Sequence, residues 1–177
     1  RHDLELAHQW FYGLVGSNEN RWPFLDEGIT SYAEEDACEA MWPDASAGQG
    51  LSFRVGLPAL YRVGAMQATR NARPSDAAGS FVSGMDYSAM VYSRTETTLR
   101  TLANVYGESA LRGAVGRYAR RYRFAHPTPD DFFAVMRERL GAEAEEALRV
   151  ALTERSSVDY VAAEVAKEQV DGVRHVR

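Results

Sequence analysis

The sequence predicts a mainly α-helical fold with one β-strand near the C-terminal end. Apolar residues recur at helical spacing over most of the chain. Glycines and one strong helix-start motif separate these stretches, and strand-like alternation occurs only in the tail. With 177 residues and 45% hydrophobic content, the chain is long enough to bury one core.

The N-terminal third is predicted to hold three helices. Residues 2–15 carry apolar side chains every three or four positions, and Gly16 begins a stop signal. A second helix is expected over residues 26–41. The third, over residues 51–69, is expected to be interrupted by Pro58, which lacks the backbone N–H of a helix interior.

After a loop over residues 71–84, the remaining helices are marked by their ends. Thr128 is followed by a proline and two acids, a sequence typical of a helix start. Gly107 and Gly141 are typical of helix ends. We therefore expect four helices, over residues 87–105, 108–123, 129–140 and 142–152.

The tail differs from the rest. Alternation over residues 158–163 favours a strand, which has no evident partner. We assign residues 1–153 to a helical domain part and residues 154–177 to a tail or the start of a following β domain. The chain opens at Arg1 inside a predicted helix, which we interpret as an internal piece of a longer protein.

Composition excludes several classes of function. A net charge of −5 is poor for general nucleic-acid binding, and we interpret the basic run Arg117, Arg120, Arg121 and Arg123 as a solvated helix face. No apolar run is long enough for a membrane span. Cys38 is the only cysteine, so neither an internal disulfide nor a cysteine zinc site is expected. The compartment stays open.

The first stretch with chemical content is Leu4-Glu5-Leu6-Ala7-His8. The zincin pattern H-E-x-x-H places two histidines four residues apart on one helix face, where both can bind one metal ion, and its glutamate acts as the base. Glu5 and His8 fit this pattern. Leu4 stands at the first histidine position and has no donor atom; His2 points about 120° away from His8 on a regular helix.

Glu27 is the candidate for a further metal ligand. Eighteen residues separate it from His8, and a glutamate added to two histidines completes the ligand set of thermolysin-like enzymes. The competing interpretation is an ordinary first-turn acid, which the helix dipole favours. His8 itself could be a core histidine, and Glu5 a surface glutamate.

The sequence contains the run E-L-A-H-Q-W-F and then L-D-E-G, with 18 residues between the histidine of the first run and the glutamate of the second. This arrangement resembles the aminopeptidase N-like (gluzincin) zinc metallopeptidases, and the resemblance covers roughly residues 2–140. The resemblance implies the helical half of a zincin, thermolysin-like, catalytic domain. It also implies zinc as cofactor, hydrolysis of N-terminal peptide bonds and a peptide substrate in the intact protein. Position 4, His8 and Glu27 would be the zinc ligands and Glu5 the base.

The resemblance also implies a role for a tyrosine at the start of a later helix. Val91-Tyr92, followed by apolar residues at helical spacing, looks like this element, and Tyr92 is the candidate oxyanion donor. Tyr87 precedes it by five residues, as a second tyrosine does in the leukotriene hydrolase branch. The alternative for either tyrosine is a place in the core.

The leucine at position 4 leaves two functional hypotheses open. Either the chain comes from a zinc metallopeptidase that is inactive or impaired here, or it is a pseudopeptidase, a peptide- or protein-binding helical module without metal. In the second case we expect a cationic His8 to pair with Glu5 or Glu27. Leu4 could equally be an engineered change or a sequence error. The resemblance places the family's amine-binding segment and the β half of the domain upstream of the zinc helix. Apart from that β half, we expect the helical part to expose an apolar face and to self-associate.

Overall fold

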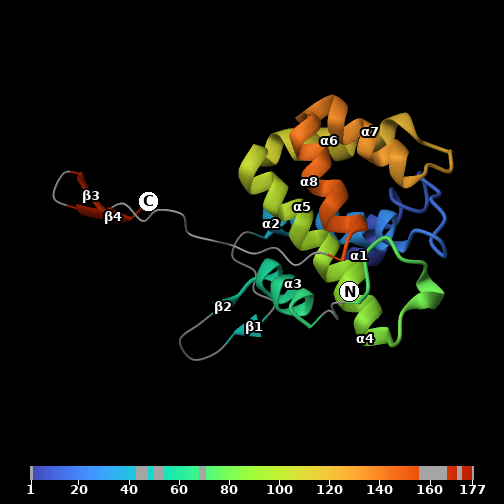
Figure 1. Ribbon diagram of the computed structural model, residues 1–177, viewed down its shortest axis with the longest axis horizontal. Helices are drawn as coiled ribbons and strands as arrows, with labels where there is room; N and C mark the ends of the chain where they lie inside the picture. The colour runs from blue at the N-terminus through green and yellow to red at the C-terminus, as the bar shows by residue number, and fades with distance from the viewer. Residues whose placement is uncertain are drawn as a thin grey trace.

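The computed structural model describes residues 2–42, 48–49, 54–67, 71–155, 167–170 and 173–176. Side chains are described over residues 5–42, 55–67 and 71–155. The described chain is mainly α-helical, as predicted (Figure 1). Its elements are α1 (His2–Ala7), the 3₁₀ turn η1 (Pro23–Leu25), α2 (Glu27–Met41), α3 (Leu57–Ala65), the 3₁₀ turn η2 (Ala78–Ser80), α4 (Gly84–Tyr87), the π-helix η3 (Ser88–Arg94), α5 (Thr95–Tyr106), α6 (Glu108–Arg121), α7 (Pro129–Leu140) and α8 (Ala142–Thr153).

Strands are few and short. β1 (Gly48–Gln49) pairs antiparallel with β2 (Arg54–Val55), and β3 (Lys167–Val170) pairs antiparallel with β4 (Val173–Val176). The strand predicted over residues 158–163 lies outside the described residues, and the division of the chain after residue 153 stays a prediction. No helix in the described ranges is long and apolar enough to cross a membrane.

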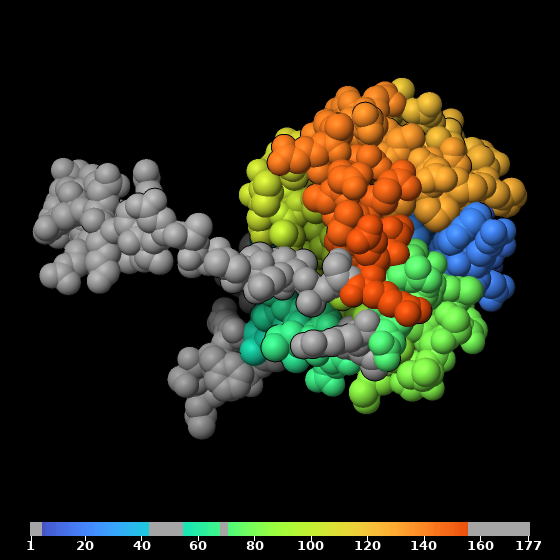
Figure 2. Space-filling model, viewed as in Figure 1, coloured from blue at the N-terminus to red at the C-terminus, as the bar shows by residue number. Residues whose placement is uncertain are grey.

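The core lies where α2, α5, α6, α7 and α8 meet. Large side chains with no exposed surface fill it, including Phe24, Ile29, Leu99, Leu111, Tyr118, Phe132, Met136 and Leu148. Figure 2 shows the segments of α7 and α8 (orange) along one side of this body. It also shows the N-terminal segment (blue) beside the segment that leads to α4 (green), where the amide of Ala78 donates to the carbonyl of Asn20.

Local chemistry explains the ends of the later helices. The Thr128 hydroxyl accepts from the Asp131 amide, and the Asp131 carboxylate accepts from the Thr128 amide at 2.8 Å, which makes a capping box at the start of α7. Gly107 and Gly141 have φ angles of 100° and 98°, which residues with a Cβ rarely adopt. The predicted boundaries of α6, α7 and α8 therefore agree closely with the structure.

Two predicted helices have the wrong bounds. The first ends at Ala7 rather than at residue 15, because the chain turns at Tyr12, with a φ angle of 97°, and buries Phe11 and Val15 in the core. α3 begins only at Leu57. Pro58 lies in its first turn, where a missing N–H has no cost, so the proline starts this helix rather than interrupting it.

A buried ion cluster joins α2 to α5. Arg100, 5% exposed, donates from Nε to Glu35 Oε2 at 3.0 Å. Its Nη2 lies 2.6 Å from the same oxygen in an ion pair, and its guanidinium stacks over the Tyr32 ring. Glu96, 1% exposed, lies beside the same pair. Its burial, and to a lesser extent the nearby Glu35 carboxylate, raises the pKa of Glu96 to about 9. Glu96 therefore stays protonated at neutral pH.

Candidate functional site

All four predicted site residues line one shallow cleft. Its volume is about 230 Å³, and its walls are Glu5, His8, Tyr12, Glu19, Asp26, Glu27 and Tyr92. Glu5 lies on α1 and Tyr92 on η3, and Glu27 begins α2. The other four residues lie in the segment between α1 and α2. Residues far apart in the sequence thus meet at one place.

The His8 ring is held in a defined orientation. Its Nδ1 atom lies 3.0 Å from Asp26 Oδ1 and 3.2 Å from the Phe11 carbonyl oxygen. Both oxygens accept hydrogen bonds, so Nδ1 carries a hydrogen, and in the neutral imidazole Nε2 keeps a free lone pair. A carboxylate on the far nitrogen of a histidine is the usual support for a metal-ligating imidazole.

The free face of His8 meets Glu27. Nε2 lies 3.2 Å from Glu27 Oε2, and that oxygen is buried without a hydrogen-bond donor among the described residues. Two donor atoms about 2.1 Å from a tetrahedral zinc ion would stand about 3.4 Å apart. The pair therefore has the spacing of two ligands of one ion, and the unsatisfied oxygen is the kind of atom that a cation would satisfy.

Burial and the neighbouring groups act on the pKa of His8 in opposite directions. Burial lowers the pKa of His8, but the carboxylates of Asp26 and Glu27 and the Phe11 carbonyl raise it, and the net direction is upward. Burial raises the pKa of Asp26 to about 6, although His8 acts in the opposite direction. The predicted partner Glu27 is present, whereas Glu5 forms no ion pair with His8 among the described contacts.

Asp26 is the residue that sequence reasoning missed. It directly precedes Glu27 in the run L-D-E-G and is 2% exposed. A buried acid is costly unless it has a partner, so an aspartate next to a proposed ligand was a usable signal. Its partner, however, is His8, 18 positions earlier, and that contact depends on how α1 and α2 pack.

Tyr92 reaches the cleft from η3. Burial, and after it the interaction with Glu27, raises the pKa of the Tyr92 hydroxyl. Its ring contacts the Tyr87 ring edge to face, with the centroids 5.9 Å apart. A π-helix hydrogen-bonds between residues five apart, so the wide turn explains why these two tyrosines lie on one side.

Gly28 brings η3 close to α2. A Cβ at this position would lie 2.7 Å from the Val91 carbonyl oxygen and would also collide with the Thr95 side chain. Only a residue without a side chain permits this approach. Because Val91 precedes Tyr92, the glycine after Glu27 is one reason that Tyr92 and Glu27 meet.

The described residues supply only part of a metal site. His8 and Glu27 fit two corners of a tetrahedral set, but no group of three or more His, Cys, Asp or Glu within the described ranges is arranged to hold a metal ion. The side chains of His2 and Leu4 lie outside the described residues, and leucine has no donor atom. The set is thus incomplete for a catalytic zinc ion, which needs three protein ligands.

Comparison with known proteins identifies similar sequences. Residues 2–153 match the model of the peptidase family M1 domain. Aminopeptidase M1-B of Oryza sativa subsp. japonica is 25% identical over 139 residues, which are 77% of this chain and 15% of that protein. Aminopeptidase N of Mus musculus is 26% identical over 130 residues, 69% of this chain and 13% of that protein.

A solved structure is also similar. A mutant M1 zinc metallopeptidase from Deinococcus radiodurans, bound to a Tyr-Ser-Ala substrate, superposes with a TM-score of 0.67 and 25% identity. The match covers 89% of this chain and 33% of that one. The chain thus spans about 15% of the length of the curated relatives and a third of the solved structure.

Proposed function

Because this chain belongs to peptidase family M1, we propose that it is the helical half of an aminopeptidase-type catalytic domain whose zinc site Leu4 leaves incomplete. Hydrolysis of N-terminal peptide bonds is therefore impaired. The observation that carries this proposal is the 3.2 Å separation of His8 Nε2 and the unsatisfied Glu27 Oε2. The relatives named aminopeptidase support the reaction class.

Five residues of the cleft have a role in this proposal. His8 and Glu27 would hold the zinc ion, which when bound polarises a carbonyl and makes water more acidic. Glu5 takes the proton of the attacking water and passes it to the leaving amine. Tyr92 donates its phenolic hydrogen to the developing oxyanion. Asp26 orients His8 without touching substrate.

A second candidate is a pseudopeptidase that binds peptides without metal. The specific observation in its favour is that Asp26 and Glu27 both face His8, so that a protonated imidazole can take the place of a cation. In that case the cleft keeps its shape, and restoring a histidine at position 4 produces no turnover.

A peptidase assay on the full-length protein distinguishes the two candidate functions. We expect Leu4→His to gain zinc-dependent release of N-terminal residues from short peptides. Leu6→His is the matched control, because Leu6 lies on α1 but is 60% exposed and lines no part of the cleft. Glu5→Gln added to Leu4→His should abolish turnover while zinc stays bound. Zinc binding without turnover in Leu4→His would favour the binding module.

Self-association is part of the same proposal. α3 exposes Leu60 and Val63, and Met66 follows it at 85% exposure. Apolar side chains gathered on one surface favour contact with another molecule. We expect an oligomer in gel filtration, and a monomer that elutes at 19.7 kDa would contradict this point.

A further inference from the structure

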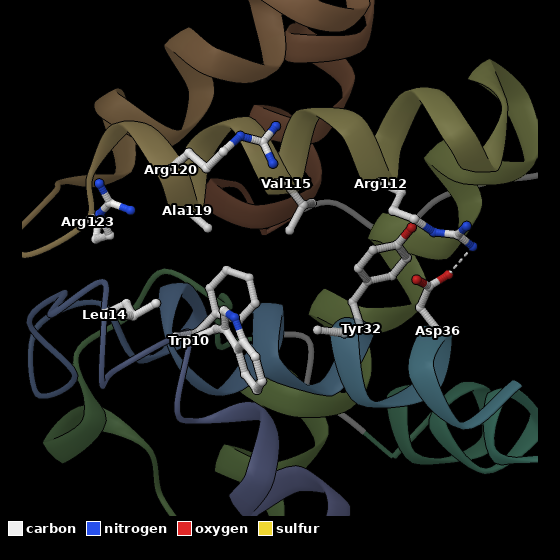
Figure 3. A pocket seen from close by; sticks show the side chains of 12 residues that line it. Trp10, Leu14, Tyr32, Asp36, Arg112, Val115, Ala119, Arg120 and Arg123 are labelled. Atoms are coloured by element: carbon white, nitrogen blue, oxygen red, sulfur yellow. Dashed lines mark hydrogen bonds and ion pairs between the residues drawn. The ribbon is translucent and has the colours of Figure 1, made fainter. Parts of the chain in front are cut away.

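A second hollow lies between α2 and α6, and the segment that follows His8 also lines it. Its volume is about 440 Å³, within the range of about 300–1,000 Å³ typical of small-molecule sites. Figure 3 shows Trp10 and Tyr32 on one side and α6 on the other. We call this hollow the α2–α6 groove. It shares no lining residue with the cleft around His8.

The walls of the groove are apolar and aromatic. Trp10 is 53% exposed and faces Val115 and Ala119 of α6 across the hollow, with Leu14 beside it (Figure 3). Phe11, 5% exposed, lies beneath. Half of an indole ring is thus left in solvent next to other apolar groups, and covering it would remove that apolar surface from water.

The arginines at the end of α6 and just after it divide into two groups. Arg117 and Arg121 pair with Glu138 on α7, with shortest distances of 3.9 and 2.8 Å. Arg120 and Arg123 line the groove, and neither forms an ion pair with any described residue. The sequence run that we interpreted as one solvated face therefore has two sides, and only the side at the groove has cations without a carboxylate.

Two further features shape the polar part of the groove. Gly116 lies directly under Arg120, because a Cβ there would stand 3.2 Å from Nη1, so the guanidinium rests on the helix surface. At the other end Arg112 pairs with Asp36 at 2.6 Å. The nearby Tyr32 hydroxyl is buried without a hydrogen-bond partner among the described residues. The end of the groove whose cations lack a described carboxylate partner is therefore the one with Arg120 and Arg123.

We propose that the α2–α6 groove binds an organic carboxylate with an aromatic or branched aliphatic body. The carboxylate pairs with Arg120, whose planar guanidinium group matches its two oxygens, and Arg123 adds positive charge at the same end of the groove. The body packs against Trp10 and Leu14, where a flat apolar group covers the exposed indole. This site takes no zinc ion and shares no lining residue with the cleft around His8.

Calorimetric titration of the chain with N-acetylphenylalaninate tests the proposal, with its isosteric neutral amide as the paired probe. We expect the carboxylate to bind at one site and the amide to bind at least tenfold more weakly. Arg120→Ala combined with Arg123→Ala should weaken carboxylate binding tenfold or more. Arg117→Ala combined with Arg121→Ala, in the same run of arginines and with the same loss of charge, should leave the affinity unchanged. Circular dichroism verifies the fold of each variant.

A second readout places the ligand. The indole N–H resonance of Trp10 should shift on titration with the carboxylate, and the same shift should persist in His8→Ala. Equal affinity for the carboxylate and the amide would overturn the proposal, as would equal loss in both arginine pairs or no binding at all. Self-association that disappears in Arg120→Ala with Arg123→Ala would show that a second copy occupies the groove, which would also overturn it.

Discussion

His8 Nε2 lies 3.2 Å from Glu27 Oε2, although 18 residues separate the two in the sequence. The turn after α1 and the start of α2 bring them together, and Asp26 holds the opposite nitrogen of the ring at 3.0 Å. We propose that this relationship is what remains of a metal site whose first ligand position is a leucine.

Asp26 should act through His8. In a Leu4→His background we expect Asp26→Ala to lower zinc affinity about 10–100-fold, the usual cost of removing such a support. Competition with a chromophoric chelator measures the affinity. Glu19→Ala is the control, because Glu19 lines the same cleft but is exposed. An equal effect of the two changes would show general loss of negative charge rather than orientation of His8.

Gly28 should tolerate no side chain. Gly28→Ala places a methyl group against the Val91 carbonyl and Thr95, and such overpacking costs about 1–3 kcal/mol in the free energy of unfolding. Urea denaturation measures this cost. Gly79→Ala, where a Cβ would meet nothing within 4 Å, should have little effect. A neutral Gly28→Ala would mean that η3 does not pack so closely on α2.

Phe132 should be one of the main supports of the core. It is fully buried and contacts the Tyr118 ring edge to face at 5.1 Å, so Phe132→Ala should cost about 3–5 kcal/mol in the free energy of unfolding. Phe124 is 78% exposed, and Phe124→Ala should cost less than about 0.5 kcal/mol. Thermal denaturation of both variants distinguishes them, and similar values would contradict the placement of α7 in the core.

Glu96 should make stability fall as pH rises. Its pKa is 4.5 when unperturbed and about 9 in the fold, so between these pH values the folded chain binds more protons than the unfolded chain and loses stability with increasing pH. Glu96→Gln mimics the protonated form and should be more stable than the parent at pH 8 by about 1–3 kcal/mol.

The advantage of Glu96→Gln should shrink toward pH 5, where the parent carboxyl is also protonated. Denaturant titrations at both pH values measure it. Glu146→Gln, at an exposed position of α8, is the control and should leave the pH dependence unchanged. A constant difference between Glu96→Gln and the parent over this pH range would contradict a protonated Glu96.

Features with local causes were predictable from the sequence. The start of α7 follows from Thr128 and the residues after it, and the ends of α5 and α7 follow from Gly107 and Gly141. Each depends on neighbours within one helical turn. The predicted site residues Glu5, His8, Glu27 and Tyr92 do line one cleft, although their chemical roles stay predictions.

Features with distant causes were not predictable. The early end of α1 depends on burial of Phe11 and Val15 beside residues near Ala125, to which Val15 is bridged. The Asp26–His8 contact and the division of the α6 arginines depend on which helices pack together. Helical periodicity is the same on either side of such contacts, so the pattern alone could not reveal them.

Zinc titration by calorimetry tests the central claim most directly. The stoichiometry and affinity are measured for the unaltered chain, for Leu4→His, and for Leu4→His combined with His8→Ala. We expect no tight zinc in the chain itself, one zinc ion per chain in Leu4→His, and loss of that ion when His8 is also replaced. One tightly bound zinc ion in the unaltered chain, or none in Leu4→His, would contradict the conclusion that Leu4 is what leaves the site incomplete.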